Sequence, residues 1–257
     1  AGAAIASTFS RFCSAVILIY CARSQKNEVY IRISHIFRAN LVLIRKILYI
    51  GIPSGIESGL FQLGRVLVVS IIAGFGTAQI AANAVANNLD ALGVIAGLSI
   101  NLAVITVIGR CMGAGDSRQA AFYMKKLLKI TYLLTLCTNI VLLGGLPWIL
   151  NIYSLSPEAY HYAFILVWIH NVAGTLIWPL SFMVPNALRA AGDVKYTMFI
   201  SIFSMVVFRL AASVILGSYL QWGAIGVWIA MVLDWSFRTV MFGVRYKKGK
   251  WKKMRIV

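Results

Sequence analysis

Acidic residues are scarce in this chain: only seven Asp and Glu stand against 24 Lys and Arg among 257 residues. Charged residues of either sign make up 12% and hydrophobic residues 60%, a balance unlike that of a soluble domain. A formal net charge of +17 would ordinarily suggest a nucleic-acid partner. Outside the apolar stretches, however, the basic residues fall in alternate connections. Their number therefore reflects membrane topology, and we expect no nucleic-acid partner.

Metal-binding and redox motifs are also missing. The four cysteines, Cys13, Cys21, Cys111 and Cys137, form no CxxC pair and lie in or beside apolar stretches, as free thiols acting as small apolar side chains do. The three histidines show no ligand spacing. There is no Walker A sequence, which argues against direct ATP coupling. We expect no cofactor, no bound metal and no enzyme active site.

Long apolar runs dominate what is present. About 20 residues are needed to cross the hydrocarbon core as a helix. Seven stretches qualify, residues 1–22, 49–74, 79–110, 130–150, 159–186, 196–217 and 223–244. The sequence therefore predicts an all-α integral membrane protein with seven transmembrane helices, the last six of which form one bundle in contact with the lipid bilayer.

Positive charge alternates between the connections. Residues 74–79, 151–161 and 217–223 contain no Lys or Arg, whereas the other connections and the C-terminal segment contain many. By the positive-inside rule the C-terminus is cytoplasmic. We expect a multi-pass protein of the plasma (inner) membrane.

The same pattern suggests a domain organisation. Residues 1–22 are expected to be the last helix of a preceding bundle, because the chain opens on Ala1 inside an apolar helix. Residues 23–48 are expected to form a cytoplasmic linker. Ile33, Ile36, Phe37 and Leu41 recur there at helical spacing, which suits an amphipathic helix on the membrane surface, although an ordinary basic connector fits equally. Residues 49–244 are the six-helix bundle and residues 245–257 a basic cytoplasmic tail.

Charged side chains at membrane depth are costly and need a partner or a water-filled cavity. Three acids and three arginines are taken to lie deep within the apolar spans: Glu57, Asp90, Asp234, Arg11, Arg65 and Arg209. Counted from the intervening turns near Gly76 and Leu220, Arg65 lies at a depth similar to Asp90, and Arg209 at a depth similar to Asp234. We predict two intramembrane ion pairs, Arg65–Asp90 and Arg209–Asp234, with structural neutralisation as the alternative to a transport role.

Glu57 differs from the other acids because no cation lies within one turn on its own helix. A carboxyl buried in this way holds a proton more readily, which favours exchange of a proton, or of Na⁺, near neutral pH. We predict an ion-coupling site at Glu57 and Asp90; the alternative is a packed, hydrogen-bonded carboxyl.

Further polar and aromatic side chains in the spans 49–74, 79–110 and 159–186 are candidates to face a cavity, because a polar stripe cannot face lipid. They are Phe61, Gln62, Asn83, Asn87, His170 and Asn171. His170 is also compatible with a hydrogen-bonded packing role. Pro179 and Pro185 predict a kink in the span that carries it.

Four short motifs occur along the chain in a specific order. They are Gly51-Ile-Pro-Ser-Gly-Ile-Glu57, Gly113-Ala-Gly-Asp116, Leu188-Arg-Ala-Ala-Gly-Asp193 and Gly226-Val-Trp-Ile-Ala230 leading to Asp234-Trp235. In this order and spacing the chain resembles the multidrug and toxic compound extrusion (MATE) transporter family over essentially all 257 residues.

The resemblance implies a twelve-helix transporter of two six-helix lobes, of which this chain holds the second lobe and the last helix of the first. The missing N-terminal lobe would belong to the same polypeptide. The implied function is secondary active multidrug efflux, exporting organic cations and amphipathic drugs in exchange for Na⁺ or H⁺. By the same resemblance Glu57 matches the acidic position of the second lobe's first helix, about one turn early. The helix over 159–186 lacks the mid-helix acid of the sodium-driven branch, and only Glu158 stands at its end.

An alternative within the same superfamily is a flippase for lipid-linked oligosaccharides. Its cavity would need several basic residues for a pyrophosphate group. In the sequence only Arg65 and Arg209 lie deep enough, and both have acidic residues available as partners.

Overall fold

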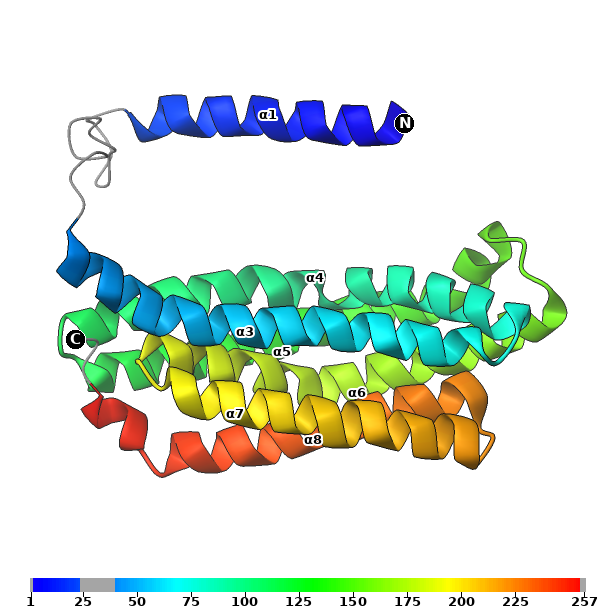
Figure 1. The fold of residues 1–257 in the computed structure, drawn as a ribbon. Coiled ribbons are helices and arrows are strands. Elements are labelled where there is room, and N and C mark those ends of the chain that lie inside the picture. The colour runs from blue at the N-terminus through cyan, green and yellow to red at the C-terminus, as the bar shows by residue number, and fades with distance from the viewer. Residues whose placement is uncertain (1, 24–39, 255–257) are drawn as a thin grey trace. The chain divides into compact units, whose positions relative to one another are not determined.

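The computed structural model describes residues 2–23 and 40–254, and these are almost entirely helical (Figure 1). They divide into two units with the boundary between Leu48 and Tyr49. The first contains α1 (Gly2–Ala22), whose apolar stretch Ile5–Cys21 is shorter than the spans of the second unit. Ile33, Ile36 and Phe37, on which the predicted amphipathic linker helix depends, lie outside the described residues.

Six helices among the described residues are long and apolar enough to cross a membrane. They are α3 (Leu41–Ala73), α4 (Thr77–Gly113), α5 (Ser117–Ile152), α6 (Pro157–Ala190), the helix that starts as α7 (Val194–Ser204) and runs to Tyr219, and α8 (Gly223–Lys247). The predicted all-α membrane fold is confirmed. The largest difference is at α5, which starts at Ser117 rather than near 130. The apolar stretch 130–150 covers only the later part of α5, because residues 118–129 include Arg118, Lys125, Lys126 and Lys129 although they are helical.

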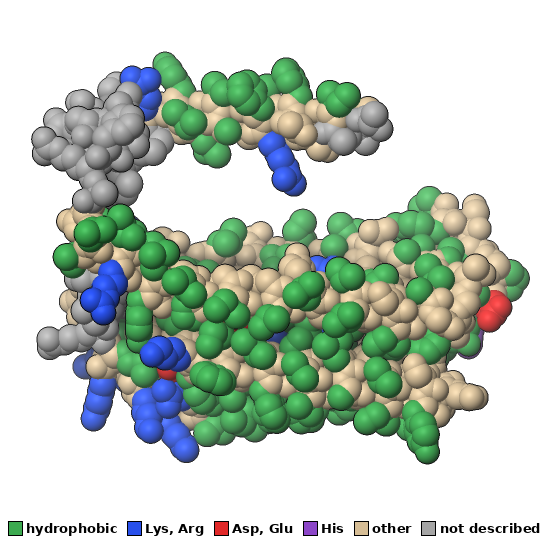
Figure 2. Space-filling model, viewed as in Figure 1, with side chains coloured by type: hydrophobic (Ala, Val, Ile, Leu, Met, Phe, Trp, Pro, Cys, Tyr) green, Lys and Arg blue, Asp and Glu red, His purple; other side chains and the backbone are tan. Residues whose placement is uncertain are grey.

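The ends of the six-helix unit differ in charge. Exposed Lys and Arg side chains gather where α4, α6 and α8 end, while apolar side chains cover the flank of the bundle (Figure 2). This end is called the basic end below, and it includes Arg118, Lys125, Lys195 and Lys247. The broad exposed apolar flank is the surface that a membrane-spanning bundle presents to lipid.

α6 occupies the middle of the bundle, packed against α4, α5 and α8. Side chains from these helices form two buried clusters, one around Leu146, Leu166 and Trp228 and the other, nearer the basic end, around Met124, Leu188 and Phe242. Buried polar side chains, described below, lie on the same helices.

The repeated Gly-Asp motifs fold into the same turn. At 113–116 Gly115 has φ 79° and the Asp116 N–H donates to Cys111 O; at 190–193 Gly192 has φ 95° and the Asp193 N–H donates to Leu188 O. A positive φ at this position is typical of glycine after a helix end, and the bond to the fifth residue back closes a Schellman motif. The motif thus ends both α4 and α6 at the basic end and reverses the chain.

The span from Val194 to Tyr219 changes its helical winding along its length. After α7 it continues as π-helix over Met205–Ala211 (η1) and Val214–Tyr219 (η2). π-Helical segments are rare and occur frequently at functional sites. α3 approaches this segment closely, because a Cβ atom added at Gly64 would overlap the Met205 side chain. Arg209 lies within η1.

Candidate functional site

Asp90 of α4 lies in a buried polar group between α4 and α6. Its Oδ1 is 3.0 Å from His170 Nδ1 and accepts a 3.4 Å hydrogen bond from Asn171 Nδ2. Asp90 and His170 are 7% and 6% exposed. The imidazole also packs between Trp228 and Trp235, with ring centroids 5.7 and 5.0 Å away. Two ionisable groups are therefore paired deep in an apolar bundle.

The predicted Arg65–Asp90 ion pair is wrong, because the partner of Asp90 is His170. Counting residues from a turn gives the depth of a side chain but not the direction in which it leaves the helix. Asp90 contacts His170 of α6, whereas Arg65 of α3 lines a cavity between α3, α4, η1 and α8 without reaching Asp90.

Asn139 of α5 extends the polar group around Asp90. Its Nδ2 donates to the Asn171 carbonyl oxygen at 3.2 Å and to Thr175 Oγ1 at 2.7 Å. The helices are close here, since a Cβ atom at Gly93 would lie 2.7 Å from Asn139 Oδ1. Within the described residues neither Asn139 Oδ1 nor Asn171 Oδ1 accepts a hydrogen bond. α4, α5 and α6 are thus tied through one polar layer.

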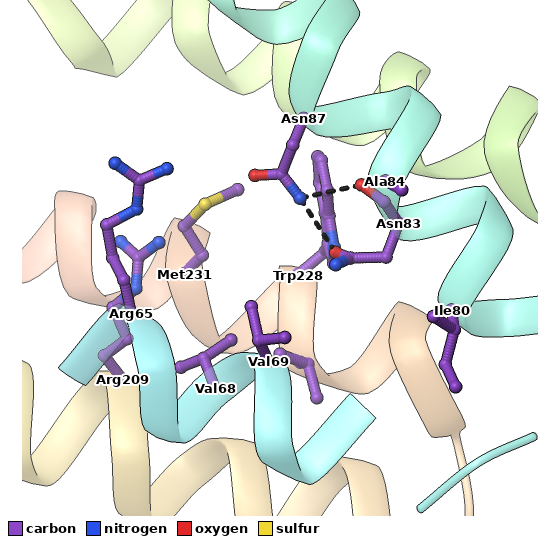
Figure 3. Close-up of a pocket in the computed structure, with 11 residues that line it drawn as sticks. Arg65, Val68, Val69, Ile80, Asn83, Ala84, Asn87, Arg209, Trp228 and Met231 are labelled. Carbon is purple, nitrogen blue, oxygen red and sulfur yellow. Dashed lines mark hydrogen bonds between the residues drawn. The ribbon is translucent and has the colours of Figure 1, made fainter. Parts of the chain in front are cut away.

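A cavity of about 320 Å³ lies between α3, α4, η1 and α8. Arg65 and Arg209 line one side of it, and Asn83 and Asn87 lie across the cavity from them (Figure 3). Asn87 Nδ2 donates to Asn83 Oδ1 at 3.1 Å, and Trp228 Nε1 donates to the same oxygen at 3.0 Å. Asn83 and Asn87, two of the four amide side chains that the sequence predicted to face a cavity, line this one.

Not all predicted cavity residues reach this space. Gln62 is exposed on α3 and does not line the cavity, and His170 and Asn171 belong to the Asp90 group. The Phe61 ring packs instead against two guanidinium groups, with Arg209 Cζ 5.6 Å and Arg238 Cζ 5.8 Å from its centroid. Phe61 therefore stabilises cations within the bundle.

Glu57 has a cationic partner on another helix, contrary to the prediction of an unpaired acid. Its Oε1 accepts a 2.9 Å hydrogen bond from Arg189 Nη2, in the last turn of α6. Glu57 is 7% exposed, and its Oε2 has no hydrogen-bond donor among the described residues. The sequence placed Arg189 in a connection because the motif Leu188–Asp193 reads as a loop, but α6 continues to Ala190.

Arg209 and Asp234 lie together, as predicted, with Nη1 and Oδ2 3.5 Å apart. Asp234 is fully buried, and its Oδ1 accepts a hydrogen bond from the Ser204 hydroxyl. The pair joins η1 to α8.

Arg238, one turn after Asp234, is a buried cation that the sequence reasoning missed. It is 2% exposed, donates from Nη2 to Ser201 Oγ at 3.2 Å, and stacks on Phe182 with Cζ 4.9 Å from the ring centroid. Asp234 and Glu57 attract it, whereas Arg189 and Arg209 repel it. The available signal was an acid and a base four residues apart inside one apolar span.

The MatE family model matches residues 53–215 of this chain. The chain belongs to the MatE family. The resemblance expected from the motifs is thereby confirmed, and the matched region contains Glu57, Arg65, Asp90, Arg189 and Arg209.

Curated MatE relatives align along the whole chain. A probable multidrug resistance protein NorM of Thermotoga maritima is 24% identical over 256 residues, which is 100% of this chain and 54% of that protein. The uncharacterized transporter YisQ of Bacillus subtilis is 24% identical over 98% of this chain and 55% of its own length. The chain thus spans about half the length of the curated relatives it matches.

Solved structures show the same fold. An outward-facing multidrug resistance MATE family transporter of the MOP superfamily matches with a TM-score of 0.84 and 20% identity, over 98% of this chain and 57% of that one. A MOP superfamily transporter from Pyrococcus furiosus matches with a TM-score of 0.70 and 18% identity, over 81% and 45% of the two chains. The helical arrangement is therefore that of one part of a larger MatE transporter.

Proposed function

We propose that this chain is the second lobe of a secondary active transporter that exports amphipathic drugs in exchange for H⁺ or Na⁺. Its membership of the MatE family, and relatives named as probable multidrug resistance proteins, support this function. A first lobe of similar size would complete a twelve-helix transporter, because the chain covers 54% of the Thermotoga relative. The two lobes would then rock against each other around a central substrate path.

The observation that carries the proposal is the Asp90–His170 pair. An acid and an imidazole 3.0 Å apart, both buried among membrane-spanning helices, are costly to maintain for packing alone. An imidazole nitrogen accepts a proton but is a poor ligand for Na⁺, which prefers oxygen. The pair therefore favours H⁺ as the coupling ion.

A proton on this pair would change the contacts of the surrounding layer. Protonation of Asp90 removes the negative charge that His170 Nδ1 and Asn171 Nδ2 face. Asn171 also bonds Asn139 of α5 through its carbonyl oxygen, so the change reaches α4, α5 and α6. Loading and release of a proton shift a two-state transporter only if its two states bind the proton with different affinity. A layer shared by three helices would provide such a difference if the spacing of its groups changes as the helices move.

The membrane orientation follows from charge. The basic end would face the cytoplasm, with the chain's C-terminus on that side of the plasma membrane. The cavity of about 320 Å³ lies beside Asn87 and Trp228, in the half of the spans away from the basic end, and it would form one wall of the substrate path.

The test uses the full-length transporter, with both lobes, in proteoliposomes. Movement of a fluorescent amphipathic dye is followed under an imposed proton or sodium gradient. We expect movement driven by the proton gradient, its loss in Asp90→Asn and Glu57→Gln, and wild-type movement in Glu158→Gln, an exposed acid at the start of α6. Dye movement that neither gradient drives would overturn the proposal.

A flippase for lipid-linked oligosaccharides is a second candidate, and one observation favours it. Arg65, Arg189, Arg209 and Arg238 are cationic side chains in membrane-spanning helices, and Arg65 lacks the acidic partner that the sequence suggested. A pyrophosphate group would suit such a surface. Translocation of a fluorescent polyprenyl pyrophosphate, without gradient-driven export of the dye, would favour this candidate.

A further inference from the structure

The charged side chains that line the cavity between α3, α4, η1 and α8 are all positive. Two arginines, Arg65 and Arg209, line it, and none of the described residues that line it is acidic. The guanidinium of Arg65 repels that of Arg209, and the two lie near each other in Figure 3. Like charges held together at membrane depth are unfavourable unless something of opposite charge joins them.

The carboxylates nearby do not neutralise these two arginines. Arg65 has no hydrogen bond or ion pair with any residue in the described ranges 2–23 and 40–254. Asp234 bonds Arg209 from outside the cavity, but one of its oxygens is occupied by Ser204, and it also attracts Arg238. Glu57 and Asp234 thus face Arg189, Arg209 and Arg238, and no acid among the described residues pairs with Arg65, so positive charge on the cavity side remains uncompensated.

We propose that this cavity binds the anionic group, a carboxylate or phosphate, of an amphipathic substrate. This inference rests on the proposed transport function and specifies the substrate class. It replaces the organic cation that the family resemblance suggested, because a cation placed beside Arg65 and Arg209 would be repelled.

The donors in the cavity match an anion. Guanidinium groups bind carboxylate and phosphate oxygens through two parallel hydrogen bonds, and a pair of them can bind one group from two directions. The amide nitrogen of Asn87, on the opposite side, is already bonded to Asn83, so the arginines are the donors, while Trp228 and Met231 provide apolar surface. A volume of about 320 Å³ accommodates one small aromatic body with its charged group.

The experiment compares two probes that share one fluorophore and differ in charge. Dansyl-glycine carries a carboxylate, and dansylcadaverine carries an ammonium group. Each is titrated into the purified full-length transporter, and the change in dansyl emission gives its Kd. We expect tighter binding of dansyl-glycine, and in Arg65→Gln a Kd for dansyl-glycine that is roughly tenfold to a hundredfold weaker with dansylcadaverine unaffected.

A matched control and a charge reversal separate a binding role from a structural one. Arg118→Gln removes an exposed arginine in the first turn of α5 and should leave both Kd values unchanged. Arg65→Glu should invert the preference in favour of dansylcadaverine. Because the Arg65 side chain is exposed in this lobe, the variant should elute from size-exclusion chromatography like the wild type. Equal weakening of both probes by Arg65→Gln would overturn the inference.

The outcomes distinguish this inference from the transport proposal. Gradient-driven export of dansylcadaverine with no binding of dansyl-glycine would retain the transport function and overturn the anion site, which would mean that acids of the first lobe neutralise the arginines. Binding of dansyl-glycine without gradient-driven movement of either probe would support the anion site and overturn the transport function. Displacement of dansyl-glycine by a polyprenyl pyrophosphate would support the site and identify a lipid as the source of the anion.

Discussion

Arg245 of α8 binds Asp193 through two hydrogen bonds, Nε to Oδ2 at 2.7 Å and Nη2 to Oδ1 at 3.2 Å. The contact fastens the end of α8 to the turn between α6 and α7. The Arg245 guanidinium also packs on Tyr196, 4.5 Å from the ring centroid. The Asp193 side chain is only 5% exposed, so this turn depends on its partner to compensate the buried charge.

Arg245→Lys should therefore destabilise the protein despite keeping the charge. An ammonium group cannot reproduce the bidentate hydrogen bonding to Asp193 or the stacking on Tyr196. We expect a loss of roughly 1–2 kcal/mol in unfolding free energy, measured by denaturant unfolding in detergent. Lys247→Arg, an exposed change two residues away, serves as the control and should be neutral. Equal stability of Arg245→Lys and wild type would show that only charge matters here.

Removal of Arg189 should cost more than removal of its partner Glu57. In Arg189→Gln the Glu57 carboxylate stays buried without a cation within hydrogen-bond distance, which typically costs roughly 3–5 kcal/mol. In Glu57→Gln the remaining Arg189 side chain is 25% exposed and can reach water. The double variant Glu57→Gln/Arg189→Gln should recover part of the loss. A double-mutant cycle of unfolding free energies measures this, and strictly additive losses would contradict a direct pair.

Two glycines of the same helix should respond oppositely to alanine. A Cβ atom at Gly97 of α4 would overlap the Trp178 ring, whereas one at Gly109 meets no atom within 4 Å. We expect Gly97→Ala to lower the unfolding free energy by roughly 1–3 kcal/mol through overpacking. Gly109→Ala should raise it by about 0.5–1 kcal/mol, because alanine favours the helix. Thermal unfolding of the two variants side by side is the measurement, and a loss in both would point to helix flexibility rather than space.

Trp251 should hold the basic C-terminal segment against the bundle. It is 2% exposed, stacks on Tyr246 with ring centroids 5.0 Å apart, and donates from Nε1 to Tyr246 O at 3.0 Å. In Trp251→Ala we expect trypsin to cut after Lys247 and Lys248 much faster than in the wild type. Trp251→Phe keeps most of the packing and should be cut only slightly faster. Identical cleavage of all three proteins, followed by mass spectrometry, would show that this residue does not secure the segment.

The helical fold could be predicted because apolar length is a strict requirement of a membrane span. The turns near Gly76 and Leu220 and the second Gly-Asp turn also follow from local sequence, since glycine and acid positions specify them. The pairing of charges across the bundle could not be predicted in the same way. Arg209 meets Asp234 at the expected depth, but Asp90 meets His170, because depth along a helix leaves its rotation and its neighbours undetermined.

The residues whose roles the sequence did not predict were missed for specific reasons. Arg238 stands inside an apolar span, where a single cation looks like an exception rather than part of a group. Arg189 was assigned to a connection, although the last turn of α6 carries it back toward Glu57. The π-helical winding after Ser204 has no clear local signal, so residues beyond it, including Arg209, lie on a face that α-helical periodicity does not give.

The two indole rings beside His170 give the proposed coupling site an intrinsic optical reporter. Trp228 and Trp235 lie 5.7 and 5.0 Å from the imidazole, so a charge that appears on that ring forms next to both chromophores. Proton arrival would then register as a change of tryptophan emission, without an added label. Because Trp228 also lines the cavity, the same emission band would respond to substrate, and one spectrum could follow both halves of an exchange cycle.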